Sequence, residues 1–341
     1  MEIRGKTALV TGAAGCVGGR LAERLAADEG MRVRALVRDP AKARRLGKTD
    51  GIEVVRGDVT RPDSLRPAVA GCQLVFHAAA RVGDWGTRTE FYEANVRGTE
   101  NVLEAALAAG LERFVHISSI AVYGIEAGPG TDEFSPHRPC GDNYIDTKIE
   151  AERLAFEYYR GRGLPLTVIQ PSSIYGPHAG IWTVRPVELM RTHRMALIGG
   201  GRGLCPPVYI DNLVDGIVLA TRHDQAVGEA FIITDGLSVT WKEFFGFYAR
   251  MMGRGSFLSF PKSLAWLAAL VVEAGARLTG WRPTFTRTTI RTLTLRSTYD
   301  ITKARERLGY VPRLSLEEGM RRTEAWLREE GYLPRQAASR K

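Results

Sequence analysis

The chain has few cysteines for its length, and their placement argues against a disulfide framework. Cys16, Cys72, Cys140 and Cys205 lie far apart and form no closely spaced pair. A chain of 341 residues does not need disulfides for stability, so we expect reduced thiols and a cytoplasmic location. The six histidines show no ligand spacing with cysteine or acidic residues, and we expect no metal site.

No apolar run is long enough to form a membrane-spanning helix. The most apolar segment is 257–281, in which the uninterrupted run Leu264–Val272 covers only nine residues. Because a spanning helix needs about twenty residues, we expect a core or lid helix here. A peripheral membrane contact through 257–281 is the alternative. The N-terminal segment has no apolar stretch followed by a cleavage site, so we expect no signal peptide.

The composition lacks any strong bias. Hydrophobic residues make up 44% and charged residues 25%, which excludes a disordered chain, a collagen-like fibre and a multi-span membrane protein. The net charge is +9, but the basic residues are spread over the whole length and form no compact cluster with aromatic residues. We therefore expect no nucleic-acid partner. An anionic small ligand or an anionic membrane surface accounts for the sign of the charge.

The first half alternates between short β-rich runs and helix-like stretches. The predicted strands are 7–11, 33–37, 52–55, 74–77 and 114–117, with further strands at 166–170 and 230–234. The predicted helices between them are 17–27, 40–46, 61–69 and 91–109, the last ending at Gly110 as a cap. This order predicts an α/β fold with a doubly wound parallel sheet, a Rossmann fold. Residues 171–207 read as loops with one short helix.

A glycine-rich turn follows the first predicted strand and opens the first helix. It carries Gly12, Gly15 and Gly18, with Cys16 and Val17 between the last two. Glycines at this spacing allow a tight turn, close approach of the backbone to a pyrophosphate, and close packing of helix on strand. The helix N-terminus then offers unpaired N–H groups to the phosphates. The pattern predicts dinucleotide binding.

The end of the second strand indicates which dinucleotide is bound. An acid that would hold the ribose hydroxyls of NAD(H) is missing at Val37, and Arg38 follows. Arg38 can pair with a 2′-phosphate and stack on adenine, with Lys42 assisting. NADP(H) is therefore favoured. NAD(H) remains the alternative, because Asp39 can serve as the acid if the register shifts by two residues.

The end of the third strand is expected to meet the adenine ring through Asp58 and Val59. The alternative for Asp58 is a cap for the following helix.

A tyrosine and a lysine four residues apart suggest acid–base chemistry. Tyr144 and Lys148 share one face if the segment is helical. A neighbouring ammonium favours the phenolate, so the pair can exchange a proton with a substrate oxygen. Ser119 follows the fifth strand, at the sheet edge where such folds bind ligands, and can donate to the same oxygen. Turn formation is the alternative role for Ser118 and Ser119.

Together these motifs resemble the extended short-chain dehydrogenase/reductase family over about residues 5 to 330. The matching motifs are Thr11–Gly18, Asp58, His77–Ala80, Asn95–Thr99, Ser118–Gly124, Tyr144–Lys148, Pro171–Pro177 and Val208–Asn212.

The resemblance implies roles for individual residues. Tyr144 is the general acid or base, Lys148 holds the nicotinamide ribose and lowers the pKa of the tyrosine, and Ser119 orients the substrate oxygen. Ala78 and Ala79 line the cofactor, Pro171 and Ser173 approach the nicotinamide, and Asn95 is structural. One departure is Gln170, where the family often has arginine.

Within the family, several phrases are similar to the 3β-hydroxysteroid dehydrogenase and dihydroflavonol-reductase-like branch. They are Ala80–Gly86, Pro207–Asp215, Tyr299–Ala304 and Leu308–Pro312. Ile120 and Ala121 stand where sugar-nucleotide dehydratases carry an Asp-Glu pair, which argues against that activity. An epimerase is harder to exclude, because Arg282, Arg287 and Arg291 can hold a diphosphate.

The resulting expectation is an NADP(H)-dependent oxidoreductase that interconverts a hydroxyl and a ketone on a hydrophobic substrate, such as a sterol, a flavonoid-like compound or a 3-oxoacyl compound. A sugar-nucleotide epimerase or reductase is the alternative, and a sensor of the cofactor without turnover is a third reading. Residues 1–176 with 208–235 should bind the cofactor, 177–207 and 236–330 should form a smaller substrate-binding lobe, and 331–341 a basic tail. The resemblance implies a homodimer through 91–109 and 144–159.

Overall fold

The computed structural model describes residues 1–283 and 285–334. Most of the expected basic tail, 335–341, lies outside these residues. Tyr332 lies against Trp326 and Leu333 is buried, so the packed chain continues at least to Leu333.

A parallel sheet of seven strands forms the centre, in the order β11-β6-β5-β4-β1-β2-β3. The strands are β1 (Thr7–Thr11), β2 (Arg32–Val37), β3 (Ile52–Arg56), β4 (Leu74–His77), β5 (Arg113–Ile117), β6 (Leu166–Pro171) and β11 (Glu229–Ile233). Every residue of β4, β5 and β6 is buried, as expected for parallel strands covered on both faces. The predicted Rossmann fold is confirmed.

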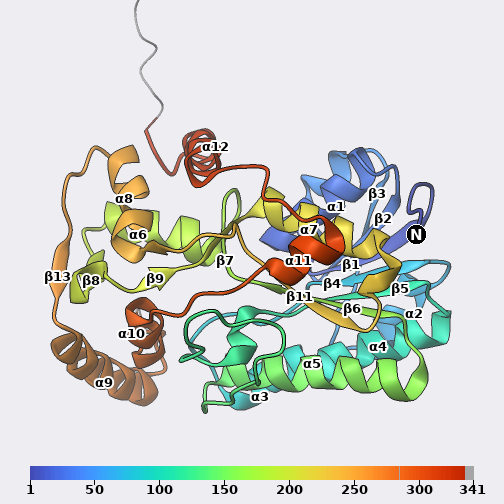
Figure 1. Cartoon of the computed structure of the whole chain (residues 1–341), viewed down its shortest axis with the longest axis horizontal. Helices are drawn as coiled ribbons and strands as arrows, with labels where there is room; N and C mark the ends of the chain where they lie inside the picture. The colour runs from blue at the N-terminus through green and yellow to red at the C-terminus, as the bar shows by residue number, and fades with distance from the viewer. Residues whose placement is uncertain (284, 335–341) are drawn as a thin grey trace, which may run out of the picture.

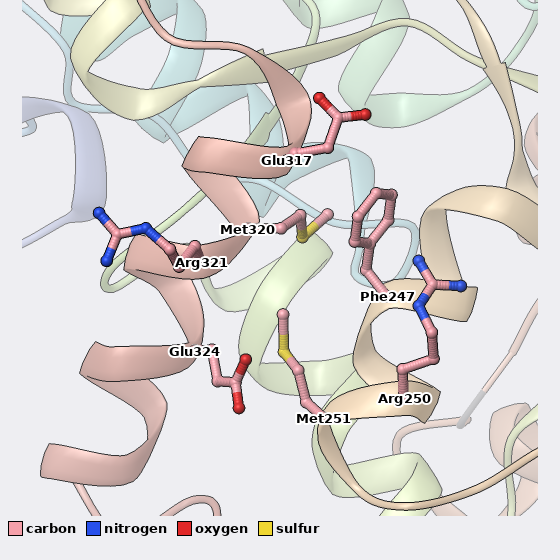
Figure 2. A pocket seen from close by; sticks show the side chains of 7 residues that line it. All are labelled: Phe247, Arg250, Met251, Glu317, Met320, Arg321 and Glu324. Atoms are coloured by element: carbon pink, nitrogen blue, oxygen red, sulfur yellow. The ribbon is translucent and has the colours of Figure 1, made fainter.

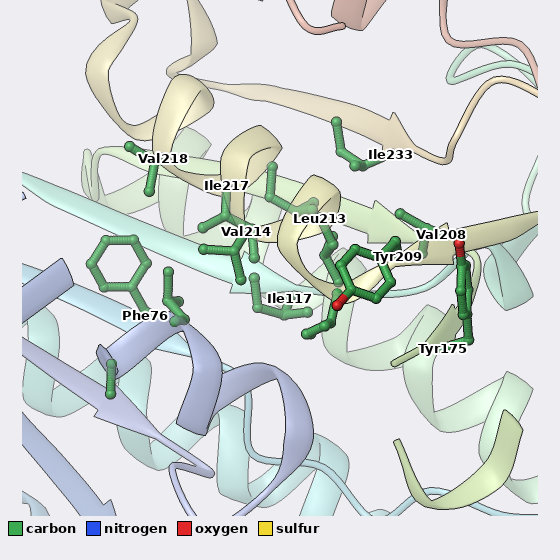
Figure 3. Close-up of a cluster of buried hydrophobic side chains, with 14 of the residues drawn as sticks. Phe76, Ile117, Tyr175, Val208, Tyr209, Leu213, Val214, Ile217, Val218 and Ile233 are labelled. Carbon is green, nitrogen blue, oxygen red and sulfur yellow. The ribbon is translucent and has the colours of Figure 1, made fainter. Parts of the chain in front are cut away.

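Helices cover both faces of the sheet (Figure 1). One face carries α2 (Pro62–Val69), α4 (Gly98–Ala109) and α5 (Asn143–Arg162), and the other carries α1 (Cys16–Ala27), α7 (Ile210–Arg222) and α11 (Thr302–Leu308). Figure 3 shows how α7 fills the second face, with Leu213, Val214 and Ile217 directed toward Phe76 and Ile117 of the sheet. Burying each such side chain contributes about 1.5–3 kcal/mol, so this packing positions the sheet edge firmly.

Two predicted helices differ from the structure. The helix expected over 91–109 is α3 (Arg88–Tyr92), a π-helical turn over Glu93–Arg97, and then α4, which ends at Gly110 in a left-handed conformation. The helix expected over 40–46 is instead a 3₁₀ helix at Pro40–Ala43 and another at Leu46–Lys48. Pro40 at the first position and the Asp39 cap start this short turn.

A second lobe extends beyond the carboxyl edge of the sheet. Residues 171–207, predicted as loops, carry four short strands besides α6 (Arg185–Arg191): β7 (Ser173–Tyr175), β8 (Ala196–Ile198), β9 (Leu204–Cys205) and β10 (Pro207–Tyr209). The later part carries β12 (Val239–Thr240), α8 (Trp241–Met251), β13 (Leu258–Phe260), α9 (Lys262–Thr279) and α10 (Arg287–Thr294). Strands this short pair across long gaps in sequence, as β13 does with β8, which is why local pattern missed them.

The apolar segment 257–281 is not a core helix. In α9 only Ala269, Glu273 and Ala276 are buried, and the helix lies at the end of the lobe beside α10 (Figure 1). Within 1–283 and 285–334, no helix is both long and apolar enough to cross a membrane. The last helix, α12 (Leu316–Glu329), packs against α8.

Candidate active site

The glycine-rich turn lies against the end of β4. Gly12 has a φ of +68°, and a Cβ there would lie 2.8 Å from the carbonyl oxygen of Ala78 and from the Cα of Ala79. A Cβ at Gly18 would lie 2.5 Å from the carbonyl oxygen of Gly12, while Gly15 donates its amide to that oxygen at 2.9 Å. The structure thus brings the predicted residues Gly12, Gly15, Gly18, Ala78 and Ala79 together in a cradle. A side chain in place of the hydrogen of Gly12 or Gly18 would collide with the backbone of this cradle. Such a backbone cradle at a helix N-terminus fits a pyrophosphate.

Cys16 and Val17 form the first turn of α1, next to this cradle. The Cys16 thiol donates to the carbonyl oxygen of Pro177 at 3.4 Å, and burial raises its pKa to about 12. Cys16 therefore stays a neutral thiol at physiological pH.

A positive charge that the sequence analysis missed lies behind the cradle. Arg45 forms an ion pair with Glu23 at 2.7 Å, and its guanidinium abuts Gly19 of α1. The same charge lowers the pKa of His178, after the larger effect of burial. Arg45 was missed because β2 separates it from the glycine motif in the sequence. The two segments become neighbours only in the folded chain.

The selectivity residues lie at the end of β2. Arg38 and Lys42 are exposed there, while the Asp39 carboxylate accepts a hydrogen bond from the amide of Ala41 at 3.0 Å. Asp39 is therefore engaged as the cap of the 3₁₀ helix. Any contact of Arg38 or Lys42 with a cofactor phosphate stays a prediction.

After β3, the side chain of Asp58 forms hydrogen bonds within its own turn, whereas that of Val59 packs against the helix α4. The Asp58 carboxylate accepts from the amide and the hydroxyl of Thr60, both at 3.0 Å, in the turn before α2, whereas the residue at the cap position of α2 is Arg61. Val59 packs against Gly98, and its carbonyl accepts from the Asn101 side chain at 2.9 Å.

Tyr144 and Lys148 lie one turn apart on α5, which starts at its Asp142 cap. Ser119 follows β5 and caps the next turn by accepting from the amide of Ala121 at 3.1 Å. Its hydroxyl also hydrogen-bonds with Tyr144. Lys148 is buried and donates from Nζ to the carbonyl oxygen of Ile117 at 2.9 Å. The three predicted catalytic residues are thus brought together at the carboxyl edge of the sheet.

Burial has the largest effect on both titrating groups. It raises the pKa of Tyr144, the hydrogen bond with Ser119 opposes this, and the charge of Asp142 adds to it. It lowers the pKa of Lys148 to about 8, against the opposing charge of Glu152. The expected lowering of the tyrosine pKa by Lys148 is not among these causes. At neutral pH the arrangement holds a neutral tyrosine, suited to donating a proton, beside an ammonium group.

A buried polar network behind the lysine was not predicted. Glu152 accepts from the hydroxyl of Ser118 and from the amide of Gln170, the latter at 2.8 Å, and Tyr123 donates to Gln170 at 2.6 Å. This network explains why glutamine is accommodated at position 170. It also separates the two serines, since Ser118 faces Glu152 whereas Ser119 faces Tyr144. The sequence contained one sign of this network, because Lys148 and Glu152 are four residues apart and therefore lie on the same side of a helix.

Asn95 ties the loop after β4 to α5. Its side-chain oxygen accepts from the amide of Arg81 at 2.7 Å, and its nitrogen donates to the Arg81 carbonyl and the Thr147 hydroxyl, both at 3.1 Å. Asn95 lies in the π-helical turn, and such turns are frequent at functional sites.

Pro171 ends β6 and is buried beside Ile233 of β11. Ser173 begins β7, and its hydroxyl hydrogen-bonds with Cys205. Between them, the buried hydroxyl of Ser172 has no hydrogen-bond partner among the described residues.

A cavity of about 740 Å³ opens in front of Tyr144. Its walls come from the loop after β4, the start of α5, and the facing sides of α9 and α10. The lining combines aromatic or aliphatic side chains with charged ones: Trp85, Phe91, Ile125, Trp266 and Ala276, with Arg81, Asp84, Glu90, Asp142, Glu273, Arg277, Arg282, Arg287 and Arg291.

The charges in this cavity are unevenly neutralised. Arg287 pairs with Glu273 at 2.9 Å, and Arg81 pairs with Glu90 at 3.3 Å. Arg291 instead lies over the ring of Trp266, 5.3 Å from its centre, and pairs with no carboxylate of residues 1–283 and 285–334. The cavity therefore offers free positive charge beside aromatic surface.

A smaller hollow of about 250 Å³ lies between α8 and α12 (Figure 2). Phe247, Arg250 and Met251 face Met320 and Glu324 across it. It shares no lining residue with the first cavity and contains none of the predicted site residues. Across the described ranges no group of three or more His, Cys, Asp or Glu side chains can hold a metal ion.

Comparison with known proteins agrees with this geometry. Residues 8–234 match the NAD dependent epimerase/dehydratase family, so the chain belongs to this family. A ketoreductase of a farnesylated dihydroquinoline oxide from Stigmatella aurantiaca is 32% identical over 91% of this chain and 93% of its own length. The 3 beta-hydroxysteroid dehydrogenase/Delta 5-->4-isomerase of Mycobacterium tuberculosis is 30% identical over 92% and 88%.

A 2-alkyl-3-oxoalkanoate reductase from Shewanella oneidensis is 29% identical over 94% of this chain and 86% of its own length. The solved structure of MoeE5 in complex with UDP-glucose and NAD has a TM-score of 0.76 and 26% identity, covering 96% of this chain and 99% of that one. The predicted placement in the 3β-hydroxysteroid dehydrogenase-like branch is confirmed, and the chain is an NAD(P)-dependent oxidoreductase.

Proposed function

We propose that the chain is an NADP(H)-dependent oxidoreductase that interconverts a ketone and an alcohol on a hydrophobic substrate. The observation that carries this proposal is the position of Tyr144, which hydrogen-bonds with Ser119 and also lines the large cavity. A substrate oxygen in the cavity can therefore meet both hydroxyl groups at once.

The residues divide the reduction between them. The carbonyl oxygen of the substrate accepts hydrogen bonds from Tyr144 and Ser119, which polarises the carbonyl. The glycine cradle would hold the pyrophosphate of the cofactor, and the bound NADPH would supply the hydride that the carbonyl carbon accepts. Tyr144 gives its proton to the oxygen, which completes the alcohol, and the hydrogen bond with Ser119 stabilises the phenolate that remains. Tyr144 carries its proton at neutral pH, and burial raises its pKa further above that range.

Charge at the end of β2 supports NADP(H) over NAD(H). Arg38 and Lys42 are exposed and basic, whereas Asp39 already caps a 3₁₀ helix. Fluorescence titration should show NADPH bound at least about tenfold more tightly than NADH. Arg38→Ala should remove most of that preference while leaving NADH binding unchanged, and Arg160→Ala on α5 is the matched control. Equal affinities in the unmodified protein would contradict the assignment of Arg38.

Among hydrophobic ketones, the cavity supports a 3-oxoacyl compound with an acidic group. Trp85, Phe91 and Trp266 suit a carbon skeleton, and Arg291 offers a positive charge without a carboxylate partner among the described residues. One relative is named for 2-alkyl-3-oxoalkanoates, which have this combination of groups. The free acid should therefore be reduced faster than its neutral methyl ester.

A sugar-nucleotide epimerase is the second candidate, because the same arginines suit a diphosphate. One similar structure holds UDP-glucose and NAD. An epimerase would isomerise UDP-glucose without net consumption of cofactor, whereas a reductase consumes one NADPH per ketone.

The experiment that tests the proposal is Tyr144→Phe, assayed by NADPH oxidation with a 3-oxo acid. Loss of the proton donor should lower kcat by about 10²–10⁴-fold, while NADPH binding stays within about twofold. Tyr92→Phe, on α3 and outside the cavity lining, is the control and should keep full activity. Near-full activity of Tyr144→Phe would overturn the assignment of the acid.

For the assembly, we expect a homodimer that uses α4 and α5, which lie side by side on one face of the sheet. Arg153→Glu on the exposed side of α5 should lower the apparent mass in size-exclusion chromatography if this face is the interface. An unchanged mass would argue against it.

A further inference from the structure

The outer side of the lobe carries a continuous group of exposed apolar side chains, here called the α9 outer face. On α9 these are Leu264, Leu267, Leu270, Val271 and Leu278, and Leu258, Phe260 and Trp281 flank them. Their exposure is large, reaching 59% at Leu267, 66% at Val271 and 88% at Leu278. Single exposed apolar residues are ordinary, but a contiguous group of this kind marks an interaction surface.

The opposite side of the same helix is committed to the cavity. Trp266, Glu273 and Ala276 line it, and the carboxylate of Glu273 accepts from the backbone amide of Arg287 at 2.7 Å as well as pairing with its side chain. These contacts fix which side of α9 faces the cavity and which side faces outward. The α9 outer face therefore cannot turn inward to bury itself.

The charge around the α9 outer face has one sign. Residues 254–282 contain four basic residues, Arg254, Lys262, Arg277 and Arg282, and a single acid, Glu273, which is buried and paired. The two arginines of the neighbouring α10 line the cavity and do not belong to this rim. An exposed apolar face with a basic rim is the pattern of a helix that lies at the surface of an anionic membrane.

We propose that the α9 outer face docks on the surface of an anionic phospholipid bilayer. The apolar side chains enter the boundary between headgroups and acyl chains, and the basic rim meets the lipid phosphates. A second copy of this chain is a poorer occupant. A twofold contact would place each patch against itself, so the basic rims would face one another without acids between them.

This docking has a consequence for the cavity, because α9 separates it from the α9 outer face. A docked molecule holds the cavity wall against the lipid surface, where a hydrophobic compound is concentrated. The docking rests on exposure and charge and does not depend on the proposed reaction.

Flotation with vesicles tests the proposal without any assay of activity. Vesicles of phosphatidylcholine with phosphatidylglycerol should carry the protein upward, and vesicles of phosphatidylcholine alone should carry much less. Leu267→Glu/Val271→Glu should weaken binding to the anionic vesicles at least about tenfold. Val311→Glu, at another exposed apolar site, is the matched control and should bind as the unmodified protein does.

The basic rim is tested in the same way. Lys262→Ala should weaken binding about fivefold at low salt, the equivalent of about 1 kcal/mol per basic residue at an anionic surface. Arg160→Ala, which removes the same charge far from α9, should have no effect. Circular dichroism and thermal unfolding confirm that each variant is folded.

Three results would overturn the proposal. One is equal flotation with neutral and anionic vesicles, and another is no flotation of the unmodified protein. The third is a lower apparent mass of Leu267→Glu/Val271→Glu in size-exclusion chromatography, which would assign the α9 outer face to a second copy.

Discussion

The edge of the sheet and the end of the lobe are built in opposite ways. At the sheet edge, Lys148 and Glu152 are charged residues held in the interior by hydrogen bonds to neighbouring strands and loops. At the end of the lobe, Leu267 and Val271 are apolar residues left in solvent. Polar groups are buried where chemistry needs them fixed, and apolar groups stay exposed where something outside the chain can cover them. The two regions therefore serve different kinds of partner.

The largest expected difference between the regions is in stability. Leu213→Ala opens a cavity where α7 meets the sheet and should lower the free energy of unfolding by about 2–5 kcal/mol. Leu267→Ala removes no buried contact and should change it by less than about 0.5 kcal/mol. Urea denaturation followed by circular dichroism measures both. A large loss in Leu267→Ala would mean that the chain itself covers the α9 outer face.

A smaller effect is expected at the glycine cradle. Gly12→Ala places a Cβ 2.8 Å from the backbone of Ala78 and Ala79 in addition to the strain of a positive φ, and should cost about 2–4 kcal/mol. Gly71→Ala has a similar φ of +72° but no atom within 4 Å, so it should cost only about 1 kcal/mol. Thermal unfolding compares the two. Equal losses of stability in the two variants would show that backbone strain accounts for the whole effect and that a Cβ at position 12 does not collide with the cradle.

The smallest effect concerns pH. The charge of Glu152 raises the pKa of Lys148, which burial has lowered to about 8. Glu152→Gln removes that charge, so the ammonium is lost at lower pH and the alkaline limb of the kcat profile should move to lower pH. Glu157→Gln, exposed on the same helix, should leave the profile in place. An unmoved limb in Glu152→Gln would show that Lys148 does not control the profile.

Stability should depend on pH in the same window. The pKa of Lys148 is lower in the folded chain than its ordinary value of 10.5, so the unfolded chain binds more protons between pH 8 and 10.5. This group therefore contributes increasing stability as the pH rises through that range, and a cost below it. The other titrating groups add their own dependence, so the comparison is with Lys148→Met, in which this contribution is absent.

The sequence predicted the sheet and its edge well because local patterns dominate there. Strands such as β4 are short, mostly apolar and buried throughout, and motifs such as Thr11–Gly18 require particular backbone shapes. Ser119, Tyr144 and Lys148 lie together at this edge, as predicted, because each stands in such a local motif. Arg45 and Gln170 could not be placed, because their partners Glu23, Glu152 and Tyr123 are neighbours only after folding.

The lobe was predicted poorly because its structure depends on contacts distant in sequence. The pairing of β13 with β8 joins segments more than sixty residues apart, and neither strand has a strong period of its own. The apolar run on α9 suggested burial, yet the buried residues of this helix are Ala269, Glu273 and Ala276, which face α10 or the cavity. Hydrophobicity alone does not state which partner will cover a surface.

The return of the C-terminal segment to the sheet determines where the chain can be divided. Lys303 of α11 pairs with Glu229 of β11 at 2.7 Å, and Thr131 donates its amide to the carbonyl of Thr298 at 2.9 Å. A fragment that stopped after β11 would leave one flank of α7 uncovered, although it would contain Ser119, Tyr144 and Lys148. A shortened variant made for studying the reaction therefore has to keep the last stretch of the polypeptide.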